Sequence, residues 1–332
     1  MNQFILADCT TESGALSQLH DGAVVKAGGI DLLDRMKEGL ESPTKLVNIR
    51  NISSLRGIHE TAQGLNIGAL TTLAEIEEDP AVKAHYAILS DACGHAATPQ
   101  IRNMATVGGN LLQQNRCWYF RSDDFACLKK GKDMCFAFDG LNQYHAIFDN
   151  TTCPSVAPSS AAVALLGLNA SVELASAKGK RTVAIKDFYV HPDVNPMTRT
   201  VIAPDELLTS VIIPKPASGT RSAYQKYGEK RSYDWATADA GVVLEMDGNI
   251  CRKAAIVMGA ASPVVMRSPK AEAMLAGKPI TEETARAAGK AAMEGAQPLS
   301  MNGYKVQLFP VAIYRTILLA AGKMDRDPSA VG

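Results

Sequence analysis

Residues 23–49 read AVVKAGGIDLLDRMKEGLESPTKLVNI, and this stretch decides the fold class. A short apolar strand at 23–27 ends at the pair Gly28-Gly29. The apolar residues of 30–40 then recur at the spacing of an α-helix, and a second apolar strand follows at 46–49. A strand–turn–helix–strand unit of this kind is typical of α/β folds.

The chain after this unit continues to mix strands and helices up to a proline-rich stretch near residue 215. Its apolar patterns predict strands at 65–70, 170–173 and 182–185, and helices at 72–78, 81–96 and from 161. Beyond the prolines, the patterns predict strands at 222–227, 240–246 and 254–258, and helices at 268–275, 281–295 and 306–321. We therefore expect three regions, 1–55 (α/β), 56–215 with an irregular insertion at about 113–155, and 216–325 (α+β). The tail after Lys323 is predicted to be disordered.

Composition narrows the class of protein. The 332 residues carry 34 Lys+Arg and 34 Asp+Glu, and this balance argues against a general nucleic-acid or anionic-membrane binder. The N-terminus has no basic segment before an apolar one, so we predict no secretory signal. No apolar run approaches the roughly 20 residues of a membrane span.

Four of the seven cysteines, Cys117, Cys127, Cys135 and Cys153, lie in the irregular insertion, which also carries eight aromatic residues. A segment this aromatic needs something to pack around, and four thiolates could hold a metal centre. Structural zinc sites usually contain a close Cys-x₂-Cys pair, which is absent here, so the wide intervals favour a [4Fe–4S] cube. The competing interpretation is four incidental buried thiols, and the spacing alone does not decide between them.

Two glycine pairs, Gly28-Gly29 and Gly108-Gly109, are predicted to form loops. Glycines in such loops let backbone N–H groups approach a phosphate. Neither pair matches a dinucleotide fingerprint or a P-loop, so each could be only a tight turn. Two such loops in one α/β unit favour a cofactor that carries a diphosphate.

Several motifs together resemble one family, the FAD-binding subunit of molybdenum hydroxylases, over roughly residues 3–322. The motifs are the strand–Gly28-Gly29–helix opening, IRNMATVGGNL at 101–111, PSSAAVALL at 158–166, DELL at 205–208 before VIIP at 211–214, and YQK at 224–226. The resemblance implies a two-part FAD-binding domain (1–55 and 56–215) followed by the C-terminal α+β domain of the carbon monoxide dehydrogenase flavoprotein.

The insertion is similar to that of the flavin subunit of three-subunit bacterial aldehyde oxidoreductases, on the strength of NLLQ at 110–113, RCWYF at 116–120, YHA at 144–146 and the later cysteines. That similarity implies a [4Fe–4S] cluster held by Cys117, Cys127, Cys135 and Cys153.

The resemblance also implies which residues contact FAD. The segment that would wrap the pyrophosphate comprises Lys26, Ala27, Gly28, Gly29, Ile30, Asp31, Leu32, Leu33 and Asp34. The second wall would comprise Thr106, Gly108, Gly109 and Asn110, with Leu208 and Lys226 from later strands. Ala96 and Ser160 replace an aromatic and an aspartate that are frequent in the family, so we assign them no contact.

The resemblance implies an electron-transfer oxidoreductase subunit with no catalytic residue of its own. A large subunit with the molybdenum cofactor would oxidise an aldehyde, a small [2Fe–2S] subunit would pass electrons to FAD here, and an external acceptor would receive them. The alternatives are a 4-hydroxybenzoyl-CoA reductase-like or xanthine dehydrogenase-like flavin subunit, and a zinc-stapled structural subunit without flavin. The implied compartment is the cytoplasm, or the periplasm by co-export with a signal-bearing partner.

Overall fold

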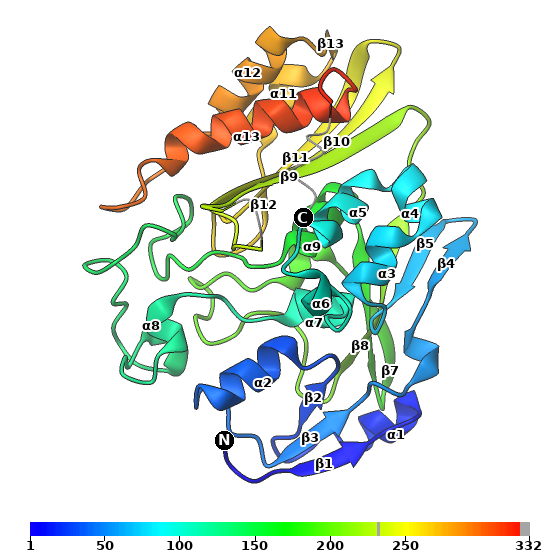
Figure 1. Cartoon of the computed structure of the whole chain (residues 1–332), viewed down its shortest axis with the longest axis vertical. Helices are drawn as coiled ribbons and strands as arrows, with labels where there is room; N and C mark the ends of the chain where they lie inside the picture. The colour runs from blue at the N-terminus through cyan, green and yellow to red at the C-terminus, as the bar shows by residue number, and fades with distance from the viewer. Residues whose placement is uncertain (231–232, 326–332) are drawn as a thin grey trace.

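The computed structural model describes residues 1–230 and 233–325, so the tail predicted to be disordered lies mostly outside the described residues. It confirms the predicted fold class: a mixed α/β region is followed by an α+β domain, and Figure 1 shows them stacked along the long axis.

A small parallel sheet with the order β1-β3-β2 forms one end of the molecule. Its elements are β1 (Ile5–Asp8), α1 (Glu12–Leu16), β2 (Val24–Lys26), α2 (Ile30–Lys37) and β3 (Lys45–Asn48). The sequence did not predict β1, because this edge strand is mostly exposed and has no apolar alternation. Helix α2 ends before the predicted residue 40, because Gly39 turns the chain at a φ of 79°.

An antiparallel sheet with the order β4-β5-β8-β6-β7 forms the middle region. Its strands are β4 (Ile58–Thr61), β5 (Gly64–Gly68), β6 (Ser171–Ser176), β7 (Gly179–Ala184) and β8 (Leu207–Pro214). Its helices are η1 (Ser53–Leu55), α3 (Leu73–Glu78), α4 (Pro80–His85), α5 (Ala87–Gly94), α6 (Pro99–Arg102), α7 (Val107–Leu112), α9 (Ser160–Gly167) and α10 (Ile185–Phe188).

Two predictions for this region were wrong. The helix expected at 81–96 is split into α4 and α5, because Tyr86 leaves the helical conformation with φ −133° and ψ 43°. The pair Gly108-Gly109 is not in a loop: Thr106 accepts a hydrogen bond from the Gly109 amide and starts α7, so both glycines lie in its first turn.

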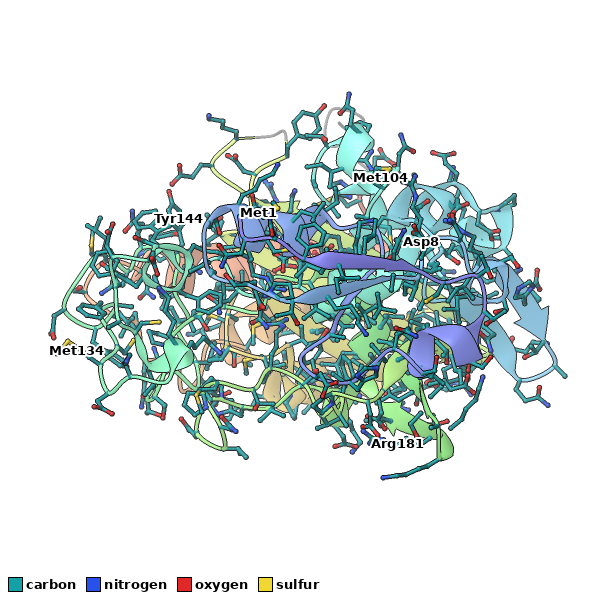
Figure 2. The ribbon with its side chains drawn as sticks, turned by 90° about the horizontal axis from the view of Figure 1, so that it is seen from below. Met1, Asp8, Met104, Met134, Tyr144 and Arg181 are labelled. Carbon is teal, nitrogen blue, oxygen red and sulfur yellow. The ribbon has the colours of Figure 1, made fainter. Side chains whose placement is uncertain are left out.

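The cysteine-rich insertion contains only two short helical turns among its described residues, α8 (Trp118–Arg121) and η2 (Leu128–Lys130). Figure 2 shows it as a projection at one end of the molecule, with Met134 near its tip.

The C-terminal domain is an antiparallel sheet with the order β12-β11-β10-β9, in which β13 also pairs with β11. Its elements are β9 (Thr220–Tyr227), β10 (Ala238–Asp247), β11 (Ile250–Gly259), β12 (Met266–Arg267), α11 (Pro269–Leu275), β13 (Lys278–Pro279), α12 (Glu282–Ala291) and α13 (Lys305–Ala320). Helices α11 to α13 cover one face of the sheet, and α5 and α9 pack against the other (Figure 1). The domain is therefore fixed onto the middle region through a shared apolar core. No helix among the described residues is long and apolar enough to cross a membrane.

Candidate functional site

The three regions meet around one large cavity of about 700 Å³. The helices α2, α7 and α9 all begin at its wall, through Ile30, Gly108 and Ser160. Because a helix N-terminus carries partial positive charge, this cavity suits an anionic group such as a diphosphate.

The turn Gly28-Gly29 allows the chain to enter α2 close to a neighbouring loop. A Cβ at Gly28 would lie 2.0 Å from the carbonyl oxygen of Met104, and Gly29 has a φ of 82°. Among the described residues, the backbone amides of Gly28 and Gly29 donate to no acceptor. Both amides are therefore available to a ligand in the cavity.

The first turn of α7 differs in this respect. The Gly108 amide donates to the carbonyl of Ala69 at 3.0 Å, and the Gly109 amide donates to Thr106 Oγ1 at 3.1 Å. The second glycine pair therefore offers no free donors, contrary to the loop that we predicted. Gly109 instead leaves open space at the cavity wall, since a Cβ at this position would meet only Thr106 Oγ1 within 4 Å.

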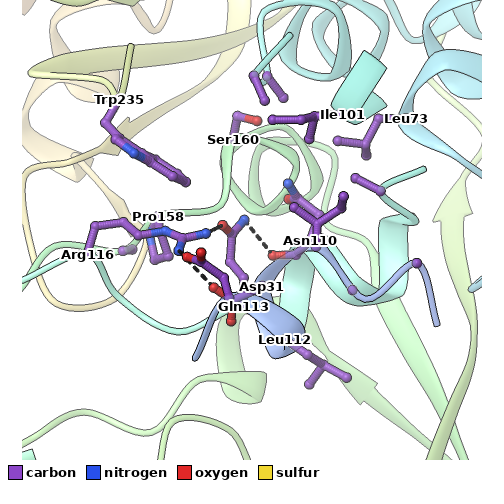
Figure 3. A pocket seen from close by; sticks show the side chains of 18 of the residues that line it. Asp31, Leu73, Ile101, Asn110, Leu112, Gln113, Arg116, Pro158, Ser160 and Trp235 are labelled. Carbon is purple, nitrogen blue, oxygen red and sulfur yellow. Dashed lines mark hydrogen bonds and ion pairs between the residues drawn. The ribbon is translucent and has the colours of Figure 1, made fainter. Parts of the chain in front are cut away.

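Ser159 ties the beginnings of α9 and α7 together. Its hydroxyl caps α9 by accepting from the Ala162 amide at 3.0 Å, and it donates to Asn110 Oδ1 at 2.6 Å. Figure 3 shows Asn110 and Ser160 on neighbouring sides of the cavity.

Most of the residues that the sequence assigned to the cofactor line this cavity. They are Ala27, Gly28, Gly29, Ile30, Asp31, Leu32, Asp34, Thr106, Gly108, Gly109, Asn110, Leu208 and Lys226. Lys26 and Leu33 are not among the lining residues. The Lys26 Nζ donates to Asn48 on the neighbouring strand, and Leu33 packs beside the small core of Leu32, Met36 and Leu46.

Lys226 bridges two segments of the cavity wall. Its Nζ donates to the carbonyls of His95 at 2.5 Å and Asp234 at 3.0 Å, and burial lowers its pKa. Ala96 and Ser160, to which we assigned no contact, also line the cavity.

A buried polar pair lies at the same wall. Tyr224 donates to Asp239 Oδ2 at 2.8 Å, and burial raises the pKa of Asp239 to about 6. Asp239 Oδ1 is buried and has no partner among the described residues, so this end of the cavity presents an unsatisfied acceptor.

Further lining residues were missed by the sequence reasoning, namely His95, Ile101, Arg116, Tyr144, His145 and Trp235. The Arg116 guanidinium lies 4.4 Å from the centre of the Trp235 ring (Figure 3). His95 and Ile101 come from the segment of α5 and α6, Arg116, Tyr144 and His145 from the insertion, and Trp235 from the loop after β9. Four of them lie in motifs that carry the family resemblance, but the sequence did not show that they face this cavity.

Asp31 connects the cavity to the insertion. Its carboxylate pairs with Arg121 at 2.6 Å and with Arg116 at 2.9 Å, and it accepts from the Gln114 amide at 3.0 Å. Burial alone would raise the pKa of Asp31, but these cationic and amide donors outweigh it and hold the pKa below its ordinary value.

A second, smaller cavity of about 10 Å³ lies inside the insertion, and all four cysteines of the insertion line it. Cys117 also lines the larger cavity, so this residue lies between the two. Cys135 hydrogen-bonds to Cys153, and this bond and the nearby Lys129 lower the pKa of Cys153. The thiolate, the form that binds metals, is thus favoured at Cys153, whereas burial raises the pKa of Cys117 to about 11.

Two buried cations accompany the cysteines. Lys129 lines the small cavity, and its Nζ donates to the carbonyl of Pro196 at 3.0 Å. Burial lowers the pKa of Lys129, and the positive charge of the nearby Arg199 lowers it further. Two buried nitrogens of Arg199 have no partner among the described residues. A guanidinium with two buried, unpartnered nitrogens fits an anionic group such as a cysteine-ligated cluster.

Three other basic residues of the insertion pair with groups that do not line the small cavity. Arg116 and Arg121 pair with Asp31, and Lys130 Nζ donates to the carbonyls of Ser122 and Phe125. Among the described residues, no three His, Cys, Asp or Glu side chains are grouped closely enough to hold a single metal ion.

Comparisons with known proteins match this architecture. The model of the "FAD binding domain in molybdopterin dehydrogenase" family matches residues 2–216, and that of the "CO dehydrogenase flavoprotein C-terminal domain" family matches residues 222–320. The chain belongs to the family of FAD-binding subunits of molybdenum hydroxylases.

Relatives and solved structures in this family match over most of the chain. The aldehyde oxidoreductase FAD-binding subunit PaoB of Escherichia coli is 32% identical over 90% of this chain and 91% of its own length. The carbon monoxide dehydrogenase medium chain of Hydrogenophaga pseudoflava is 28% identical over 85% of this chain and 82% of its own. A chain of quinoline 2-oxidoreductase from Pseudomonas putida superposes with a TM-score of 0.77 at 26% identity, covering 98% of this chain and 99% of that one.

The larger cavity fits the FAD that gives the family its name. Its volume falls within the roughly 300–1,000 Å³ of cofactor sites, and the free amides of Gly28 and Gly29 suit a diphosphate. When bound, FAD supplies two-electron redox chemistry, and the residues lining this cavity would hold it.

Proposed function

We propose that this chain is the FAD- and [4Fe–4S]-binding electron-transfer subunit of a molybdenum-containing aldehyde oxidoreductase. In this proposal a small [2Fe–2S] subunit delivers electrons to the flavin, and an external acceptor removes them. A large subunit with the molybdenum cofactor holds the substrate, so the chain itself needs no substrate pocket.

The observation that carries the proposal is the pair of adjoining cavities. Four cysteines surround the smaller one, and Cys117 lines both. Lys129, which lines the smaller cavity, and the nearby Arg199, which has two buried nitrogens without a partner among the described residues, support an anionic cluster there. A cluster that adjoins the flavin cavity is placed to exchange electrons with the flavin.

The wide ligand spacing also favours a cluster over a single zinc ion. Zinc draws its ligands into a compact tetrahedron with Zn–S distances of about 2.3 Å. A [4Fe–4S] cube is larger, so its four sulfurs stand further apart. The wide intervals between the four cysteines in the sequence therefore suit the larger group.

The aldehyde substrate class rests on the likeness to the aldehyde oxidoreductase subunit, which spans 90% of the chain. The test is to isolate the assembled complex and add aldehydes, purines and aromatic heterocycles in turn, while the visible flavin absorption is followed. We expect aldehydes to bleach the flavin. Bleaching by a purine or a heterocycle alone would assign a different substrate class, and a complex without flavin absorption would overturn the proposal.

A further inference from the structure

His145 lies between the two cavities. Its side chain lines the larger one, and its Nε2 lies 3.2 Å from the Sγ of Cys117. Of the four cysteines of the insertion, Cys117 lines both cavities, whereas the other three line only the smaller. His145 therefore contacts the sulfur of the one cysteine of the insertion that lines both cavities.

The C-terminal domain holds the backbone around His145 in place. The buried Asn302 donates from Nδ2 to the His145 carbonyl at 3.0 Å. The buried Lys305 donates to the carbonyls of Tyr144 at 3.1 Å and Ala260 at 2.9 Å. The bonds to His145 and Tyr144 join positions about 160 residues apart, and they hold the backbone that carries the imidazole beside Cys117.

Of the two ring nitrogens of His145, only Nε2 has a hydrogen-bond partner among the described residues, the Cys117 sulfur. His145 Nδ1 is buried and has no partner among the described residues. A neutral imidazole carries one N–H, and a thiolate can only accept. With Cys117 as a thiolate, the proton therefore belongs on Nε2, because the other tautomer would bury an unpaired N–H and place two acceptors against each other.

We propose that His145 is a positioning residue that donates from Nε2 to the Cys117 sulfur, fixes this ligand at the wall of the flavin cavity and raises the reduction potential of the cluster. The inference rests on the proposed function, because it requires the cluster. A hydrogen bond to a ligating sulfur stabilises the more negatively charged, reduced cluster, so removing it lowers the potential.

The test is a redox titration of the cluster, followed by electron paramagnetic resonance, in the full-length chain and three variants. His145→Leu removes the donor, and His145→Gln retains an N–H on a side chain of similar reach. His85→Leu, at an exposed position on α4, is the control.

We expect a more negative midpoint potential in His145→Leu, and values close to the unaltered chain in His145→Gln and His85→Leu. Loss of the cluster in His145→Leu alone, with retention at the original potential in His145→Gln, would also support donation by residue 145. An unchanged potential in His145→Leu, or equal shifts or equal cluster loss in both variants, would overturn the inference. An unaltered chain without any cluster would instead contradict the proposed function.

Discussion

Arg121 donates to Asp31 across 2.6 Å, although 90 residues separate them in the chain. The contact joins the cysteine-rich insertion to the first turn of the helix that begins at the FAD cavity. Arg116 pairs with the same carboxylate at 2.9 Å, so one acidic side chain holds together the two segments that surround the two cavities.

Replacing Asp31 should therefore loosen the insertion and the flavin site together. Asp31→Asn removes the nearest counter-charge of two largely buried guanidinium groups, which keep only the longer pairs with Asp34 and Glu38, and breaking a buried pair costs up to about 3–5 kcal/mol. We expect a lower melting temperature and partial loss of FAD, measured by thermal unfolding and by flavin fluorescence after desalting. Asp34→Asn is the matched control: Asp34 is 52% exposed and its two pairs are 3.6 Å long, so its effect should stay below about 1 kcal/mol.

The same carboxylate predicts how stability responds to acid. Its pKa in the folded chain lies below the ordinary value of 3.8, so the unfolded chain binds the proton more tightly. The stability that Asp31 contributes is thus fully present above that value and is lost as the pH falls through the lowered pKa. Between about pH 5 and pH 3 the unaltered chain should lose more unfolding free energy than the Asp31→Asn variant. Parallel plots of unfolding free energy against pH for the two chains would contradict this prediction.

Gly28 should tolerate no side chain. The Cβ of Gly28→Ala would stand 2.0 Å from a backbone oxygen of Met104, which cannot turn away as a side chain could. We expect a loss of about 1–3 kcal/mol of stability, as in other overpacked sites, together with weaker FAD binding. Gly303→Ala meets nothing within 4 Å and should change neither property. Full FAD occupancy in Gly28→Ala would show that the turn has a different role.

How much of this could be predicted from the sequence varies by region. The turn at Gly28-Gly29 was predicted because strand, glycines and helix are adjacent in the chain. The four cysteines were recognised by their density, and the structure places them around one cavity. Roles that depend on distant contacts were missed: His145 meets Cys117 across 28 residues, and Asn302 and Lys305 from the C-terminal domain hold the backbone at this point.

Predictions from local sequence patterns were also wrong where tertiary contacts determine the backbone conformation. The apolar spacing of 81–96 is continuous, yet the helix breaks at Tyr86, which no glycine or proline marks. The Gly108-Gly109 pair has the composition of a loop, but the Thr106 cap and the Ala69 carbonyl satisfy its amides as a helix start. Sequence spacing does not show which amides remain free.

The two cofactors should be separable by mutation. Cys127 lines the small cavity but not the larger one, so Cys127→Ser should lose most of its iron and retain FAD. Cys251→Ser is the control, because the buried Cys251 donates to the Lys253 carbonyl at 3.3 Å and a serine hydroxyl can do the same. Iron and flavin contents of the purified variants check both expectations. Unchanged iron in Cys127→Ser would remove this residue from the ligand set.

The central claim is that this one chain binds both FAD and an iron–sulfur cluster. It is tested most directly by measuring flavin, iron, acid-labile sulfide and zinc in the purified full-length chain. We predict about one FAD, with about four iron and about four sulfide per chain, as a [4Fe–4S] cube requires. A colourless chain that contains zinc and neither flavin nor iron would contradict the account.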